Sequence, residues 1–94
     1  MLLVTSATAC GGADADSSTI ANAKRAYAAA KANGVDMSNG PCLGTVAPDW
    51  VADVAHDPRQ AVDDDPANQC AAYRSGEAHH FVEFDPDGNV IRSG

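Results

Sequence analysis

The chain has 94 residues, a net charge of −7 at pH 7 and an aromatic content of 5%. This length allows one small domain with little stability to spare, and few large side chains are available to fill its core. The acidic surface repels nucleic-acid phosphates and anionic lipid headgroups, and no basic stripe offsets it, which disfavours nucleic acid as a partner.

Residues 1–18 have the composition of a targeting segment and a tether. Ala7-Thr8-Ala9-Cys10 follows a short apolar run, and residues 11–18 are small and polar. This stretch resembles the lipobox of bacterial lipoproteins, although Ala7 stands where leucine is commonest and no basic region precedes the run. The resemblance implies a lipid anchor at Cys10 and a secreted or membrane-anchored domain over residues 19–94. The alternative is a hydrophobic N-terminus with a free cysteine.

Setting Cys10 aside leaves Cys42 and Cys70 as a pair. In an oxidising compartment we expect them to form a disulfide, which would stabilise the fold by about 3–4 kcal/mol through loop closure. Neither cysteine belongs to a CxxC motif or has a basic neighbour in the sequence. Redox catalysis is therefore disfavoured.

The first predicted element is a helix over residues 21–32. Ser17 or Ser18 is a suitable N-cap, and Asn33-Gly34 is a suitable stop. One face carries a stripe at helical spacing, formed by Ile20, Ala23, Tyr27 and Ala30. This spacing favours a helix that packs on the core.

The middle of the chain is divided between a loop and a strand. Residues 35–48 are rich in glycine and proline and lack periodicity, so we expect a loop anchored by Cys42. Residues 49–56 alternate, which predicts a strand with Trp50, Ala52, Val54 and His56 on one side. A short helix from Pro48 or Asp49 is the competing interpretation.

A second helix and a hairpin complete the predicted fold. Asp65-Pro66 begins a helix that Gly76 ends, with Cys70 and Tyr73 on its inner face. Asp-Pro-Asp-Gly at 85–88 then predicts a β-hairpin. Its predicted buried face carries Val82, Phe84 and Val90, and its other face carries His79, Phe81, Glu83 and Ile91. The expected fold is α+β in the order α-β-α-β-β, with three antiparallel strands covered on one side by both helices, and one disulfide.

The hairpin also carries a family resemblance. Its sequence, Phe-Val-Glu-Phe-Asp-Pro-Asp-Gly-Asn-Val-Ile-Arg, resembles the C-terminal half of PepSY-type modules, which are extracytoplasmic domains associated with binding or restraining peptidases. The likeness covers about the last fifteen residues, and the predicted helix around Cys70 departs from the pattern. The resemblance implies a binding role outside the cytoplasm.

No motif in the sequence predicts a metal or another cofactor. His79 and His80 are adjacent, so a regular strand would direct them to opposite faces, and no HExxH or HxH spacing is present. The cluster Asp63-Asp64-Asp65 lacks the alternating ligands of an EF-hand loop. We expect it to cap a helix and form a solvated acidic turn.

The sequence therefore favours a non-enzymatic module that binds an unidentified protein or envelope component. The predicted contact surface consists of Trp50, His79, Phe81, Glu83 and Ile91. The alternative is a small secreted hydrolase of the ribonuclease type. It would use His56, His80 and Glu83 for acid–base catalysis, with one of Arg59, Arg74 and Arg92 as a phosphate clamp. That alternative requires these side chains to line one cleft.

Overall fold

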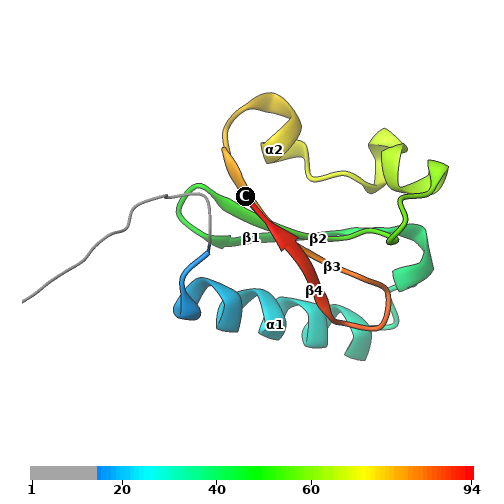
Figure 1. Cartoon of the computed structure of the whole chain (residues 1–94), viewed down its shortest axis with the longest axis horizontal. Helices are drawn as coiled ribbons and strands as arrows, with labels where there is room; N and C mark the ends of the chain where they lie inside the picture. The colour runs from blue at the N-terminus through cyan, green and yellow to red at the C-terminus, as the bar shows by residue number, and fades with distance from the viewer. Residues whose placement is uncertain (1–14) are drawn as a thin grey trace, which may run out of the picture.

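The computed structural model describes residues 15–94, so the predicted lipidation site Cys10 lies outside the described residues. The order of the main elements is α1 (Ser17–Ala32), β1 (Cys42–Ala47), β2 (Trp50–Val54), α2 (Ala71–Ser75), β3 (His80–Phe84) and β4 (Val90–Ser93). The strands form one mixed sheet in the order β1-β2-β3-β4. Figure 1 shows α1 on one face of this sheet and α2 on the other. The fold is α+β with two helices and one disulfide, as predicted.

Helix α1 covers one face of the sheet through the predicted stripe. Ala23 and Tyr27 are buried, and Ile20 and Ala30 pack against the same core. The N-cap is Asp16, whose side chain accepts a hydrogen bond from the Thr19 backbone N–H at 2.8 Å, so the predicted serine caps are wrong by one or two positions. No helix in residues 15–94 combines the length and apolar character needed to cross a bilayer.

The core beneath α1 is formed by alternate residues of β2 and β3. Ala52 pairs with Val82 and Val54 with Phe84, and all four side chains are buried. The Tyr27 ring lies 5.4 Å from the Phe84 ring, and its hydroxyl donates a hydrogen bond of 2.7 Å to the Pro86 carbonyl.

The predicted hairpin turn is present between β3 and β4 and packs against α1. Gly88 has φ = 93°, and a Cβ atom there would lie 2.8 Å from the Tyr27 ring. Glycine is therefore required at this position both by the backbone and by the close approach. Val90, however, is 39% exposed, so its predicted burial is wrong.

The predicted loop over residues 35–48 contains an edge strand, β1, antiparallel to β2. Its pairing is irregular between Cys42 and Gly44 and again between Thr45 and Ala47, and Gly44 has φ = 98°. Bulges and glycine are tolerated at a sheet edge, and they hid the strand's alternation. Leu43 and Val46 nevertheless pack against the core beneath α1.

The largest correction concerns the pairing of β2 with β3, which is parallel rather than antiparallel. Parallel neighbours require a long connection across a face of the sheet. Residues 55–79, here called the crossover, make that connection on the face opposite α1 (Figure 1). The prediction that both helices cover one side is therefore wrong.

The second predicted helix is interrupted within the crossover. Pro66–Asn68 forms a 3-10 turn capped by Asp65, Gln69 and Cys70 are extended, and α2 begins only at Ala71. The extended Cys70 forms the predicted disulfide with Cys42, 28 residues away. The bond joins the crossover to the edge strand β1.

Candidate functional site

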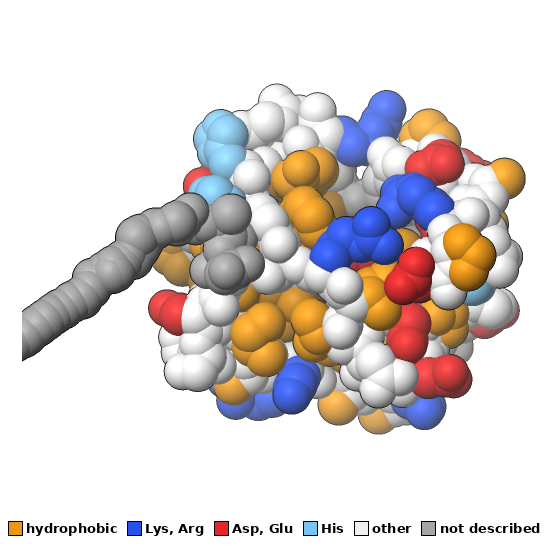
Figure 2. Space-filling view, in the orientation of Figure 1, with side chains coloured by type: hydrophobic (Ala, Val, Ile, Leu, Met, Phe, Trp, Pro, Cys, Tyr) orange, Lys and Arg blue, Asp and Glu red, His pale blue; other side chains and the backbone are white. Residues whose placement is uncertain are grey.

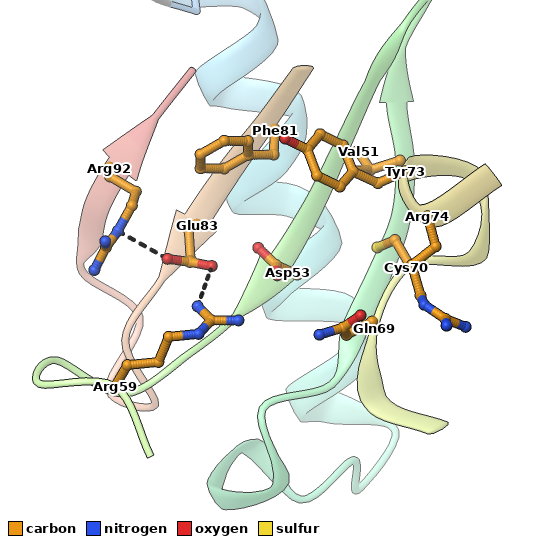
Figure 3. Close-up of a pocket in the computed structure, with 10 residues that line it drawn as sticks. All are labelled: Val51, Asp53, Arg59, Gln69, Cys70, Tyr73, Arg74, Phe81, Glu83 and Arg92. Atoms are coloured by element: carbon orange, nitrogen blue, oxygen red, sulfur yellow. Dashed lines mark hydrogen bonds and ion pairs between the residues drawn. The ribbon is translucent and has the colours of Figure 1, made fainter. Parts of the chain in front are cut away.

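A cavity with a volume of about 280 Å³ lies between the sheet and the crossover. Figure 3 shows side chains from β2, β3, β4 and the crossover directed around it. We call it the crossover pocket. Its lining residues are Val51, Asp53, Arg59, Gln69, Cys70, Tyr73, Arg74, Phe81, Glu83 and Arg92.

One end of the crossover pocket is apolar. Val51 and Cys70 are buried there, and the Tyr73 ring meets the Phe81 ring edge-to-face, with centroids 5.6 Å apart and an interplanar angle of 81°. Tyr73 is 45% exposed, so its ring forms part of the mouth. This end offers a ligand an aromatic and aliphatic surface beside the disulfide.

The floor of the crossover pocket holds two carboxyl groups from neighbouring strands. Asp53 and Glu83 are register partners of β2 and β3 and face the same side of the sheet. Glu83 is only 4% exposed and contacts two guanidinium groups. Arg59 Nη1 lies 3.4 Å from Oε2, and Arg92 Nε forms an ion pair of 2.8 Å with Oε1 without hydrogen-bond alignment.

Asp53 lacks such a partner. Its Oδ1 atom is buried and accepts no hydrogen bond from the described residues. The pKa of Asp53 is raised to about 7, chiefly by burial and then by the negative charge of Glu83, while the positive charge of Arg59 opposes the shift. The carboxyl pair therefore retains a proton near neutral pH that an exposed aspartate would release.

Positive charge is concentrated around this floor. The chain has six lysines and arginines, and Arg59, Arg74 and Arg92 all line the crossover pocket. Figure 2 shows basic side chains gathered beside acidic ones over β4 and the crossover. Arg59 is held by Asp64 at 2.8 Å and by the Asp63 carbonyl at 3.3 Å. Arg74 and Arg92 are exposed at the mouth.

Asp63 holds the start of the crossover in place. Its side chain is buried, so the predicted solvated position is wrong for this residue. Its carboxylate accepts hydrogen bonds from the backbone N–H groups of His56 and Gln60, each at 2.9 Å, and its Oδ1 lies 3.0 Å from His56 Nδ1. Burial raises the pKa of Asp63, but these hydrogen bonds outweigh it and the net shift is downward. Capping is confirmed for Asp65, which accepts from the Ala67 N–H at 3.0 Å.

A separate cluster occupies the opposite end of β2 and β3. The Trp50 and His80 rings stack with centroids 4.7 Å apart, and His79 Nδ1 lies 2.7 Å from Asp49 Oδ1. The predicted contact surface is thus divided. Phe81 and Glu83 line the crossover pocket, whereas Trp50 and His79 lie in this other cluster, and Ile91 is half-buried on β4.

The structure does not bring together the residues of the hydrolase alternative. His56 contacts Asp63 in the crossover, and His80 shares a strand face with Val82 and Phe84, opposite Glu83. Neither histidine lines the crossover pocket, whereas all three candidate arginines do. Within residues 15–94, no three His, Cys, Asp or Glu side chains converge as metal ligands.

No family model, curated protein or solved structure matches this chain. The geometry of the crossover pocket therefore provides the basis for a functional interpretation. Asp53, Gln69 and Tyr73 were not part of the predicted contact surface. The available signal was the alternation of residues 50–54, which places Asp53 beside Val51 on the face away from α1.

Proposed function

We propose that this chain is a non-enzymatic binding module of the cell envelope that takes a small ligand, or a side chain of a partner, in the crossover pocket. The observation that carries the proposal is the composition of that pocket. An apolar aromatic end adjoins a floor that holds the buried carboxylate of Glu83 and the half-buried side chain of Asp53, whose Oδ1 is buried, and three arginines line the same cavity. Pockets with an apolar lining and a few convergent polar groups are the usual form of ligand sites.

The energetics of the floor support a binding role. Burying carboxyl groups costs free energy unless each has partners, and Asp53 has none at Oδ1. A small domain has little stability to spare for such a group. Retaining it in a cavity is expected where a ligand completes its hydrogen bonds.

The location outside the cytoplasm is part of the same proposal. The Ala7-Thr8-Ala9-Cys10 segment supports a lipid anchor, and a Cys42–Cys70 disulfide is expected to persist in an oxidising compartment. Intact mass measurement of protein from the membrane fraction tests the anchor. It should find a diacylglyceryl-modified Cys10 as the first residue, whereas an unmodified soluble product would contradict anchoring.

The hydrolase alternative has less support. It depends on a histidine acting with Glu83, and general acid–base catalysis requires such groups to reach the same substrate atom. His56 and His80 do not line the cavity that contains Glu83. Binding explains the arrangement with fewer assumptions because it needs only the groups already gathered there.

The binding proposal is tested by mapping where small molecules contact the folded protein. Amide shifts in ¹H–¹⁵N NMR spectra would be followed while adding a panel of fragments that each combine an apolar and a charged group. We expect shifts at Val51, Asp53 and Phe81. Tyr73→Ser, which removes part of the apolar end, should weaken binding about tenfold, the effect of losing about 1.4 kcal/mol.

Val90→Ser is the matched control, because Val90 is a similarly exposed hydrophobic residue that does not line the crossover pocket. It should leave the affinity unchanged. Fragments that shift only residues elsewhere, or an entire panel without effect, would contradict a ligand site in this pocket.

A further inference from the structure

The contacts on the floor of the crossover pocket show which partner is missing. Glu83 has an arginine near each oxygen, Arg59 at 3.4 Å and Arg92 at 2.8 Å. Asp53 Oδ1 is buried beside it without a hydrogen-bond donor. Asp53 Oδ1 and Glu83 Oε1 both lack an aligned hydrogen-bond donor, but only Asp53 also lacks an ion-pair partner, and a positively charged donor beside it would offset the repulsion between the two carboxylates.

A simple cation does not suit the pocket, however. Arg59, Arg74 and Arg92 line the same cavity, so a ligand that carried only positive charge would meet three like charges. A simple anion does not suit it either, because it would face Asp53 and Glu83 and leave Asp53 Oδ1 unpaired. The lining favours a ligand that carries both signs of charge.

The arginines differ in their capacity to bind the negative group. Arg59 is engaged by Asp64, by the Asp63 carbonyl and by Glu83. Among residues 15–94, Arg74 forms no ion pair, and Arg92 contacts Glu83 only through Nε. The terminal nitrogens of Arg92 and the whole Arg74 guanidinium are thus available at the mouth. Figure 3 shows these two arginines on opposite sides of Asp53.

We propose that the crossover pocket binds a small zwitterion with an apolar side chain, such as a free α-amino acid with an aromatic side chain. Its ammonium donates to Asp53, its carboxylate meets Arg92 or Arg74, and its side chain packs against Val51, Tyr73 and Phe81. This inference rests on the proposed binding function and names its ligand class. No covalent step is involved.

Such binding is coupled to proton release from the carboxyl pair. The raised pKa of Asp53, about 7, means that the free pocket holds a proton below neutral pH, whereas a bound ammonium favours the ionised carboxylate. The charged groups that act on the pKa of Asp53 are Glu83 from β3 and Arg59 and Asp63 from the crossover, and Arg74 from the crossover and Arg92 from β4 line the same pocket. Affinity should be constant above about pH 7 and should fall by up to about tenfold for each pH unit below it.

The test compares four probes that share one aromatic ring, by calorimetric titration of the full chain at pH 8. They are L-phenylalanine, 2-phenylethylamine without the carboxylate, 3-phenylpropionate without the ammonium, and uncharged 2-phenylethanol. L-phenylalanine should bind at least about tenfold tighter than each of the others. At pH 6 its affinity should be about tenfold lower, with proton release detected as a dependence of the heat on the buffer.

Two variants assign the charged groups. Asp53→Asn should reduce the affinity for L-phenylalanine to that for 3-phenylpropionate and remove the pH dependence, whereas Asp87→Asn, at an exposed turn position, should change neither. The double variant Arg74→Gln with Arg92→Gln should reduce the affinity for L-phenylalanine to the affinity for 2-phenylethylamine. Preserved dispersion of the NMR spectrum shows that each variant is folded.

The outcomes distinguish this inference from the broader proposal. Equal or tighter binding of 3-phenylpropionate, 2-phenylethylamine or 2-phenylethanol would overturn the zwitterion. If L-phenylalanine does not bind but other fragments of the NMR panel shift the signals of the pocket residues, the binding function is supported and the proposed ligand class is wrong. If neither L-phenylalanine nor any fragment of the panel binds, both the binding function and the ligand class are wrong.

Discussion

The two faces of the sheet are built from the same strands but are closed by different chemistry. On the α1 face, Val54, Val82 and Phe84 are fully buried against a helix that contributes Ala23 and Tyr27. On the crossover face, the neighbouring residues of the same strands are Asp53 and Glu83, and a cavity remains above them. One residue along a strand therefore separates a packed core from a charged pocket.

The difference indicates that the two faces have separate roles: the α1 face provides the packed core, and the crossover face maintains a cavity. Hydrophobic burial, which is non-directional, is the main stabilising interaction on the α1 face, and the hydrogen bond from the Tyr27 hydroxyl to the Pro86 carbonyl adds to it. The crossover face is held by a disulfide, by the Arg59–Glu83 contact and by the Asp63 hydrogen bonds, each of which fixes a particular residue. Directional contacts of this kind can hold a cavity open, whereas close packing would fill it.

The largest expected effect comes from truncating one aromatic residue on each face. Phe84→Ala should lower the free energy of unfolding by about 3–5 kcal/mol, because Phe84 is completely buried and the surrounding core cannot collapse into the space. Phe81→Ala should cost about 1–2 kcal/mol, since Phe81 is half-buried and borders a cavity. Urea unfolding measures both, and equal losses would contradict the distinction between the faces.

The disulfide should matter chiefly for the crossover face. Cys42→Ser with Cys70→Ser should lower the free energy of unfolding by about 3 kcal/mol, because the unfolded chain regains the entropy of an open loop. Under native conditions, hydrogen exchange should accelerate in the crossover more than in α1, which has no bond to either cysteine. Uniform acceleration across both regions would show that the two faces unfold together.

The elements that sequence reasoning predicted correctly are those with regular patterns. The α1 stripe, the hairpin turn and the cysteine pair each have a local signature that the fold retains. The edge strand β1 was missed because Gly44 and the irregular register break its alternation. The parallel pairing of β2 and β3 was also missed, although the long segment between them, which includes a helix, is itself typical of a crossover connection.

The candidate site was harder to predict than the fold. Glu83 and Phe81 were selected from the hairpin, but Asp53 becomes important only once β2 lies beside β3 in parallel register. Arg59, Arg74 and Arg92 are spread along the sequence and meet because the crossover folds over the sheet. No local sequence pattern predicts that these three arginines meet. Because β2 and β3 were predicted to be antiparallel, the pocket could not be predicted from the sequence.

The smallest expected effect isolates the charge on the crossover face. Asp53→Asn should stabilise the protein by on the order of 2 kcal/mol at pH 8, because the folded pKa of about 7 lies above the ordinary value of 3.8. An acid whose pKa is raised by folding weakens the fold where the unfolded chain is ionised. The gain should therefore be largest above pH 7, shrink between pH 7 and pH 4, and vanish below. Thermal unfolding across this range measures it.

Asp87→Asn provides the control, because it removes one negative charge from an exposed position and should change stability little at any pH. Destabilisation by Asp53→Asn at pH 8 would show that Asp53 contributes to folding as an ionised group. Stabilisation combined with loss of ligand binding would instead mean that the fold tolerates a costly carboxyl group for the sake of its site, as expected where function and stability compete. Within residues 15–94, the α1 face buries no carboxyl group, so a comparable exchange of stability for binding is not expected there.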